Sequence, residues 1–422
     1  MQKVVFADLD NGMRVYSFCD RQSNLSGVGV KHGSIHNPPH KRGRSHGAEH
    51  AITCYSSRYD ERQANLLMLK YCGDPDEDWK IETERTSTFY GHGVLLYKQH
   101  MLKIFDLMAS FVRDQMFDLA TFESEMAAVH QEYCLRGVDN LEDTLDCLVH
   151  ETMYEHNPAR QRIDCDLEDL KKFTPRDIRK CLRAYVPNNM FTIFLGPSLE
   201  EAKGLARHYF DKWEPGRIPQ FHYAGDENVP VLKEIKRPVI LRAGIHQHHV
   251  AIAFPTETFL SKDAEALDIF AKILKNRLYG PLRAKNRSIN KGAYRVPVVT
   301  ERTLIHGMLS ISFATVCKEF ADAGHDFVIN EIKKMSQDLV APDEFDAAWH
   351  NAKFAYLDAF LRTPNNLADL IIETATNGDE NLVSLDYQNF CSRLHRVTRE
   401  KVRTVVNKYF MGNYVHARIV PA

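Results

Sequence analysis

Residues 174–189 read TPRDIRKCLRAYVPNN, and residues 398–413 read TREKVRTVVNKYFMGN. The two stretches align without a gap, and each leads into a short apolar run, MFTIFLG and YVHARIV respectively. Thr174 followed by Pro175 is typical of the N-cap and first turn of a helix. A helix followed by a strand is therefore predicted twice, which indicates an internal duplication.

A second pair of stretches supports the same duplication. IFDLMASFVRDQMFDLATFESEM at 104–126 aligns without a gap on FVINEIKKMSQDLVAPDEFDAAW at 327–349. The two pairs are offset by nearly the same number of residues, so they report one event. We expect an α+β protein of two homologous halves, each a largely antiparallel β-sheet layered with α-helices. The expected boundaries are 1–213, a linker at 214–231 that is rich in proline and glycine, and 232–422.

Composition excludes several classes of protein. The 422 residues are 44% hydrophobic and 26% charged with a net charge of −2, so no basic surface for nucleic acid is expected. The chain opens without the pattern of a signal peptide, and no apolar run is as long as a membrane span. The nine cysteines include no C-x-x-C pair. Free thiols in a reducing compartment are therefore expected, and we predict a cytoplasmic protein without membrane partners.

A short motif suggests metal chemistry. Residues 45–53 read SHGAEHAIT, in which His46 and His50 are four residues apart and share one face of a helix, with Glu49 beside them. This is H-x-x-E-H, the inverted form of a zinc-protease signature. With 20 histidines in the chain the pattern also fits a histidine-rich loop, because His32, His36 and His40 lie shortly before His46 and His50.

A catalytic zinc needs a third protein ligand. The stretch TFESEMAAVHQEY at 121–133 places Glu125 and Glu132 seven residues apart on one helical face, where one could bind the metal and the other could orient a histidine. In the second half, the aligned positions are Ala348 and Ala355. The duplication therefore indicates that metal chemistry belongs to the first half alone.

The chain resembles the pitrilysin/insulinase-type metallopeptidases, which include mitochondrial processing peptidase and small bacterial relatives. VGVKHGSIHNPPHKRGRSHGAEH is similar to the strand, loop and zinc helix of that family, and FESEMAAVHQE to its second metal segment. The resemblance implies one Zn²⁺ per chain with His46, His50 and Glu132 as ligands. It further implies that Glu49 is the general base and that Glu125 orients one of the histidine ligands without binding the metal.

Two further features follow from the resemblance. KIETERTSTFY at 80–90 resembles the family's edge strand, which implies that substrate pairs with Lys80, Ile81, Glu82, Thr83 and Glu84. The family also uses an arginine and a tyrosine from its second half. Arg283 and Tyr294 fit the two ends of that pattern with a longer turn between them, and Arg287 remains an alternative arginine. A zinc endopeptidase of peptides, closed as a homodimeric clamshell around a chamber, is the function implied.

Two other functions stay open at this stage. The chain could be a non-catalytic or partner-dependent subunit of a hetero-oligomeric processing peptidase, although all four residues of the zinc motif are present. It could also be a metal-binding protein without enzymatic activity, built on the histidine-rich loop and on HQHH at 246–249.

Overall fold

The computed structural model describes residues 3–19, 24–39, 41–53, 56–73, 79–93, 95, 97–135, 140–164, 167–218, 230–283, 292–378 and 385–422. The chain forms two compact units. Unit 1 comprises Met1–Leu135, Gln161–His222 and Asp358–Tyr387, and unit 2 comprises Arg136–Arg160, Tyr223–Leu357 and Gln388–Ala422. Most of the expected linker, 219–229, lies outside the described residues.

Unit 1 contains a six-stranded sheet with the order β1-β2-β6-β3-β5-β4. The β2–β6 pair is parallel and the other neighbours are antiparallel. β3 and β6 are buried along their whole length, whereas β4 lies at the edge. The bounds are β1 Val5–Asp8, β2 Arg14–Phe18, β3 Leu25–Val30, β4 Trp79–Thr83, β5 Thr88–His92 and β6 Met190–Leu195.

Unit 2 repeats this plan with five strands in the order β7-β11-β8-β10-β9. Again one pair is parallel, β7 with β11, and the rest are antiparallel. The two sheets confirm the predicted α+β class with largely antiparallel pairing. The bounds are β7 Val239–Arg242, β8 His248–Pro255, β9 Val298–Arg302, β10 Gly307–Thr315 and β11 Val415–Pro421.

Amphipathic helices cover the sheets. In unit 1, α4 has nine buried residues and packs against β3 and β5 as well as neighbouring helices, and α9 packs against β2. The helices of this unit are α1 Arg44–Thr53, α2 Glu61–Tyr71, α4 Lys98–Arg113, α5 Leu119–Tyr133, α7 Leu167–Leu170, α8 Pro175–Cys181, α9 Leu199–Phe210 and α13 Pro364–Thr376. In unit 2, α10 and α11 pack on the sheet together with α15. The helices there are α6 Leu141–Met153, α10 Ala264–Leu282, α11 Lys318–Gln337, α12 Pro342–Leu361 (whose last four residues belong to unit 1), α14 Tyr387–Leu394 (whose first residue belongs to unit 1) and α15 Arg399–Tyr409.

The duplicated helix N-termini have equivalent caps. Thr174 accepts a hydrogen bond from the backbone N–H of Asp177 at the start of α8, and Thr398 accepts one from Lys401 at the start of α15. Each helix is followed by a strand that pairs inside its sheet, β6 or β11. The repeated stretches thus fold alike, as the sequence predicts.

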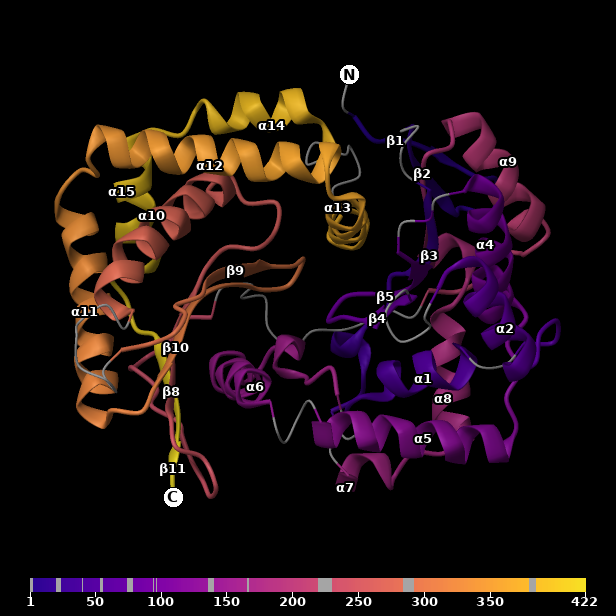
Figure 1. Ribbon diagram of the computed structural model, residues 1–422, viewed down its shortest axis with the longest axis horizontal. Helices are drawn as coiled ribbons and strands as arrows, with labels where there is room; N and C mark the ends of the chain where they lie inside the picture. The colour runs from indigo at the N-terminus through magenta and orange to yellow at the C-terminus, as the bar shows by residue number, and fades with distance from the viewer. Residues whose placement is uncertain are drawn as a thin grey trace. The chain divides into compact units, whose positions relative to one another are not determined.

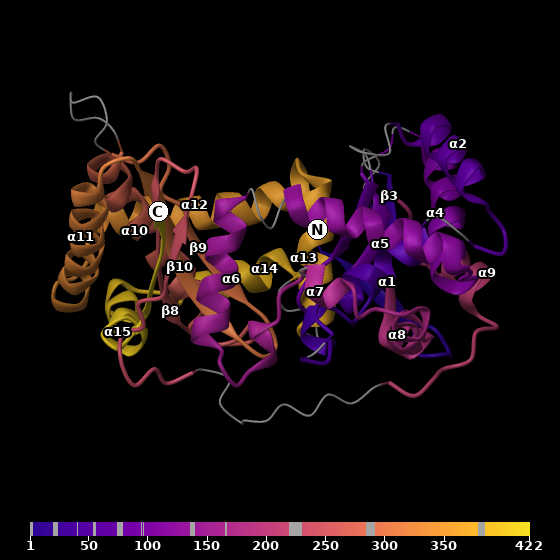
Figure 2. The ribbon, with the colours of Figure 1, turned by 90° about the horizontal axis from the view of Figure 1, so that it is seen from below.

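One pair of helices is exchanged between the halves of the sequence. α6 belongs to the first half of the chain but packs on β8 and β11 of unit 2, and α13 belongs to the second half but packs on β6 of unit 1. Their first residues, Leu141 and Pro364, are 223 positions apart, which is the offset of the repeat. Figures 1 and 2 show α6 beside β8 and across the sheet from α11, and Figure 1 shows α13 across its own sheet from α4 and α9. Among the described residues, no helix is both long and apolar enough to cross a membrane.

Candidate metal centre

Small residues on α1 allow α5 to approach it closely. A Cβ added to Gly47 would already contact Met126 and Phe173 at 3.4 Å, and Ala48 and Ala51 are fully buried in the same apolar cluster. The first turn of α1 is held from the other side, because Asn37 Oδ1 accepts hydrogen bonds from both the backbone and the hydroxyl of Ser45. The sequence HGAEHA therefore presents its polar side chains at a fixed helix–helix contact.

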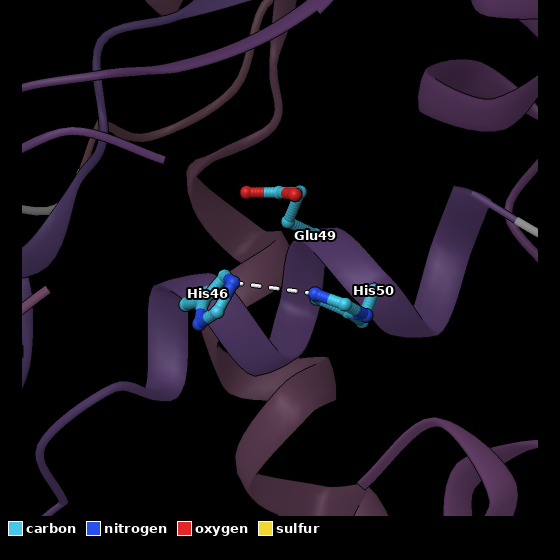
Figure 3. A group of neighbouring side chains, drawn as sticks. All are labelled: His46, Glu49 and His50. Atoms are coloured by element: carbon cyan, nitrogen blue, oxygen red, sulfur yellow. Dashed lines mark hydrogen bonds between the residues drawn. The ribbon is translucent and has the colours of Figure 1, made fainter. Parts of the chain in front are cut away.

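Three potential ligand atoms meet at this contact. The Nε2 atoms of His46 and His50 lie 3.2 Å apart, and Glu132 Oε2 from α5 lies 3.4 Å from the first and 3.1 Å from the second. Figure 3 shows the two imidazoles and Glu49 leaving the same helix, with the rings side by side. Ligand atoms around a tetrahedral Zn²⁺ are roughly 3.3 Å apart. The donor set and its spacing therefore fit zinc.

Two carboxylates lie behind the imidazoles. Glu125 Oε2 is 3.5 Å from His50 Nδ1, and Asp164 Oδ1 is 3.4 Å from His46 Nδ1. The His46 contact is an ion-pair distance without the angle of a hydrogen bond, so it is the looser of the two. A carboxylate behind a histidine ligand keeps the proton on Nδ1 and leaves the Nε2 lone pair for a metal. Asp164 was not among the residues suggested by the sequence.

The site attracts positive charge. Burial lowers the pKa of His50, but hydrogen bonds to Glu125 and Glu132 outweigh burial and raise the pKa to about 10. The same carboxylates would favour a divalent cation in place of the proton.

Glu49 has its carboxylate within 4.8 Å of a nitrogen of each imidazole and also contacts the sheet edge. Its side chain is buried, and the Thr83 hydroxyl at the end of β4 donates a short hydrogen bond to Oε2. The Thr83 hydroxyl also lies 3.3 Å from that of Thr88, which in turn donates to the carbonyl of His32. The orientation of the Glu49 carboxylate is therefore fixed by the edge strand.

The expected substrate strand is β4, with a small shift. The strand ends at Thr83, and Glu84 lies in the turn, where its N–H donates to Ser87. Lys80 is half-buried and forms ion pairs with Glu82 and Asp369. Ile81 is half-buried, and no described strand pairs with the outer edge of β4.

Arg283 and Tyr294 lie in unit 2. The Arg283 guanidinium carbon is 5.9 Å from the centre of the Tyr294 ring and 4.9 Å from that of Tyr279. A backbone bridge joins Arg283 to Ala293, and the Tyr294 side chain is exposed. The two residues suggested by the sequence are thus neighbours, whereas Arg287 lies outside the described residues.

The other histidines of the loop form a separate pair. The rings of His32 and His36 stack at 4.8 Å, and burial lowers the pKa of His36 to about 4. Burial lowers the pKa of His32 as well. Neither belongs to the groups of potential ligands found in the described part of the chain, and His40 lies outside it. In unit 2, the positions aligned with Glu125 and Glu132, Ala348 and Ala355, offer no ligand.

Two protein-family models match successive parts of the chain. The model described as "Insulinase (Peptidase family M16)" matches residues 17–167, and "Peptidase M16 inactive domain" matches residues 172–351. The chain belongs to the M16 family of peptidases. No characterised protein matched the chain in a search by sequence.

Solved structures support the same fold over the full length. A protease from Helicobacter pylori superposes with a TM-score of 0.86 at 17% identity, covering 100% of both chains. A Pseudomonas fluorescens structure described as a peptidase M16 inactive domain superposes with a TM-score of 0.83 at 14% identity, covering 99% of this chain and 98% of the other. The small two-half architecture expected from the resemblance is therefore correct.

Proposed function

We propose that the protein is a zinc-dependent endopeptidase that binds one Zn²⁺ through His46, His50 and Glu132. The proposal rests on the convergence of three ligand atoms within 3.4 Å of one another beside the buried Glu49 carboxylate. When bound, Zn²⁺ would lower the pKa of a water molecule toward neutrality and polarise the peptide carbonyl.

The residues around the ligands have distinct tasks in this proposal. Glu49 accepts the proton of the attacking water and returns one to the leaving amine. Thr83 holds the Glu49 carboxylate in one orientation through its hydrogen bond to Oε2. Glu125 and Asp164 keep His50 and His46 in the tautomer that presents Nε2 to the metal.

The substrate is an extended peptide that adds to the edge of the sheet at β4. Because β4 is the last strand of the described sheet, its outer backbone groups can pair with a peptide strand. Thr83 belongs to the end of this strand and also contacts Glu49, so a peptide bound there would lie close to the general base. Backbone pairing selects extended, unfolded segments and reads little sequence.

Arg283 and Tyr294 are proposed to donate hydrogen bonds to the developing oxyanion or the substrate carbonyl. Their closeness to each other supports a joint role. We further propose a homodimer, in which each zinc centre faces the second half of the partner chain.

Cleavage of a quenched-fluorescence peptide library with and without a chelator tests the proposed function. We expect zinc-dependent turnover that the chelator abolishes and added zinc restores. Glu49→Gln should lose turnover but keep its zinc, because Glu49 does not touch the metal in this proposal. Glu123→Gln, an exposed position on α5, is the matched control and should behave as the unchanged protein.

A zinc-loaded, folded protein that cleaves no peptide would contradict the proposal. It would favour a non-catalytic subunit of a hetero-oligomeric peptidase, in agreement with the word "inactive" in the description of the second matching domain. Substantial turnover by Glu49→Gln would instead remove Glu49 from the mechanism.

A further inference from the structure

We propose that unit 2 contains a second site for a divalent cation, formed by His150, Glu301 and His306 and named here the hairpin site. His150 Nε2 lies 3.1 Å from Glu301 Oε2, and His306 Nε2 lies 2.9 Å from Glu301 Oε1. One potential ligand atom from each of the three residues lies within 4.8 Å of the others. Two imidazoles and a carboxylate are a ligand set suited to Zn²⁺.

The tautomer of His150 indicates that a positive charge belongs at the centre of the hairpin site. Its Nδ1 lies 3.2 Å from the carbonyl oxygen of Ala159, which can only accept, so Nδ1 carries a hydrogen. In the neutral ring, Nε2 then has a lone pair facing the Glu301 carboxylate at 3.1 Å. Two electron-rich atoms at this distance repel each other unless a positive charge lies between them. That charge is either a second proton on His150 or a metal ion.

The surroundings favour a bound ion that can enter from solvent. The His150 and His306 side chains are almost fully buried, while that of Glu301 is 30% exposed. Asp146, one turn earlier on α6, places Oδ1 3.7 Å from His150 Nε2 and could supply a fourth ligand. Two buried imidazoles thus adjoin the partly exposed carboxylates of Glu301 and Asp146, which would attract a cation.

Hydrogen bonds that need no metal hold the two parts of the hairpin site, α6 and the β9–β10 hairpin, next to each other. The Tyr154 hydroxyl donates to the carbonyl of Gly307 at 2.9 Å, and the Asn157 side chain donates to that of Ile305 at 3.0 Å. Both fasten the end of α6 to the β9–β10 hairpin, which also holds Glu301 and His306. A metal at the hairpin site would therefore join the exchanged helix α6 to a hairpin about 150 residues later in the chain.

The positions in unit 1 that are equivalent to His150 and His306 are not histidines. Matching α6 with α13 by their offset of 223 places Glu373 at the position of His150. Matching the hairpins by their closing pairs, Thr83 with Thr88 and Arg302 with Gly307, places Ser87 at the position of His306. The histidine pair is therefore particular to unit 2.

Metal counting in a protein without the first centre tests this proposal. His46→Ala/His50→Ala removes two ligands of the α1 centre, and the purified variant is loaded with zinc, desalted and measured by elemental analysis. We expect about one zinc per chain to remain, and Glu301→Gln or His306→Gln to abolish it. His350→Gln, an exposed histidine on α12, is the matched control and should keep the zinc.

The unaltered protein provides a second measurement that does not depend on the double variant folding. It should bind about two zinc ions per chain, and Glu301→Gln should reduce this to about one. Zinc should also raise the thermal midpoint of the double variant by a few degrees, and Glu301→Gln should eliminate that rise. Loss of all zinc from the folded double variant, or retention of its zinc after Glu301→Gln, would overturn the proposal. In the first case the charge between His150 and Glu301 is a proton.

Discussion

At the scale of single residues, the sequence alone could place two site residues on one face of a helix. It could not show which residues far along the chain approach them. His46 and His50 share a face of α1 because four residues make about one turn, and this needed only the sequence. Glu132 lies 82 positions after His50, so its selection over Glu125 depended on the family resemblance. Asp164 lies in an irregular segment between α6 and α7, where no periodicity indicates direction, and only the folded chain brings it to His46.

Substitutions of the two glutamates on α5 should distinguish the residue that binds zinc from the residue that orients a histidine ligand. Glu132→Ala removes the carboxylate that lies close to Nε2 of both His46 and His50. We therefore expect this variant to lose the zinc bound at α1. Glu125→Ala removes the carboxylate behind His50 and should weaken zinc affinity by about 10–100-fold. Competition with a chromophoric chelator measures both affinities. A larger loss for Glu125→Ala would mean that the roles are reversed.

The hydrogen bond from Thr83 to Glu49 gives a prediction about catalysis rather than metal binding. Thr83→Val keeps the shape of the side chain and removes the hydroxyl, so the carboxylate loses its orienting donor. We expect kcat/KM to fall about tenfold or more, the equivalent of one charge-assisted hydrogen bond, with zinc content unchanged. Thr83→Ser restores a donor and should recover most of the activity. Equal activity of the valine and serine variants would show that the contact has no catalytic role.

At the scale of helices and strands, the sequence pattern predicted the edge strand and two helix starts. The exact end of the strand depended on the geometry of the turn that follows it. The edge strand was expected over 80–84, yet β4 ends at Thr83 because Glu84 bonds to Ser87 across the turn. The N-caps at Thr174 and Thr398 were predictable because a short polar side chain there satisfies an N–H that the helix leaves unpaired. By contrast, nothing local in the sequence marked Asp263 as a point of convergence for α10 and α15.

Asp263 should stabilise unit 2 in a pH-dependent way. At the start of α10 its buried carboxylate accepts from Lys401, from Lys408 at 3.0 Å and from Tyr409 at 2.7 Å. Burial raises its pKa, but these bonds outweigh burial and lower the pKa from 3.8 to about 2. A lowered pKa stabilises the fold above the unfolded value of 3.8, and the contribution declines as pH falls toward 2.

We therefore expect Asp263→Asn to reduce the free energy of unfolding by about 2 kcal/mol at pH 7. The difference from the unchanged protein should shrink by pH 3. Urea unfolding at both pH values measures it, with the exposed Asp338→Asn as control. A difference that stays constant between pH 7 and pH 3 would show that the Asp263 charge is not its source.

At the scale of the whole molecule, the repeat predicted two halves but not the exchange of α6 and α13. Each helix buries one apolar face, and the two sheets have similar plans, so the apolar pattern of a helix does not indicate which sheet it covers. The choice between them depends on the path of the chain, which a pattern of apolar residues does not encode. The compact units consequently differ from the halves of the sequence.

The distribution of the proposed site between units leads to a test by complementation. His46, Glu49, His50 and Glu132 belong to unit 1, whereas Tyr294 belongs to unit 2. If the working site combines unit 1 of one chain with unit 2 of its partner, Glu49→Gln and Tyr294→Phe should each be nearly inactive alone. A mixed dimer would then contain one site in which both residues are intact. We expect peptide cleavage to return toward half of the unchanged level in the mixed fraction.

The recovery should increase with the extent of subunit exchange, because only mixed dimers contain the intact site. Mixing under conditions that block exchange is the control and should restore nothing. Sedimentation or native mass spectrometry of the same samples reports the fraction of mixed dimers, so activity can be expressed per mixed dimer. If mixed dimers form from two folded variants and remain inactive, Glu49 and Tyr294 must act within one chain. In that case both substitutions inactivate separate sites, and no pairing of the two variants can repair either of them.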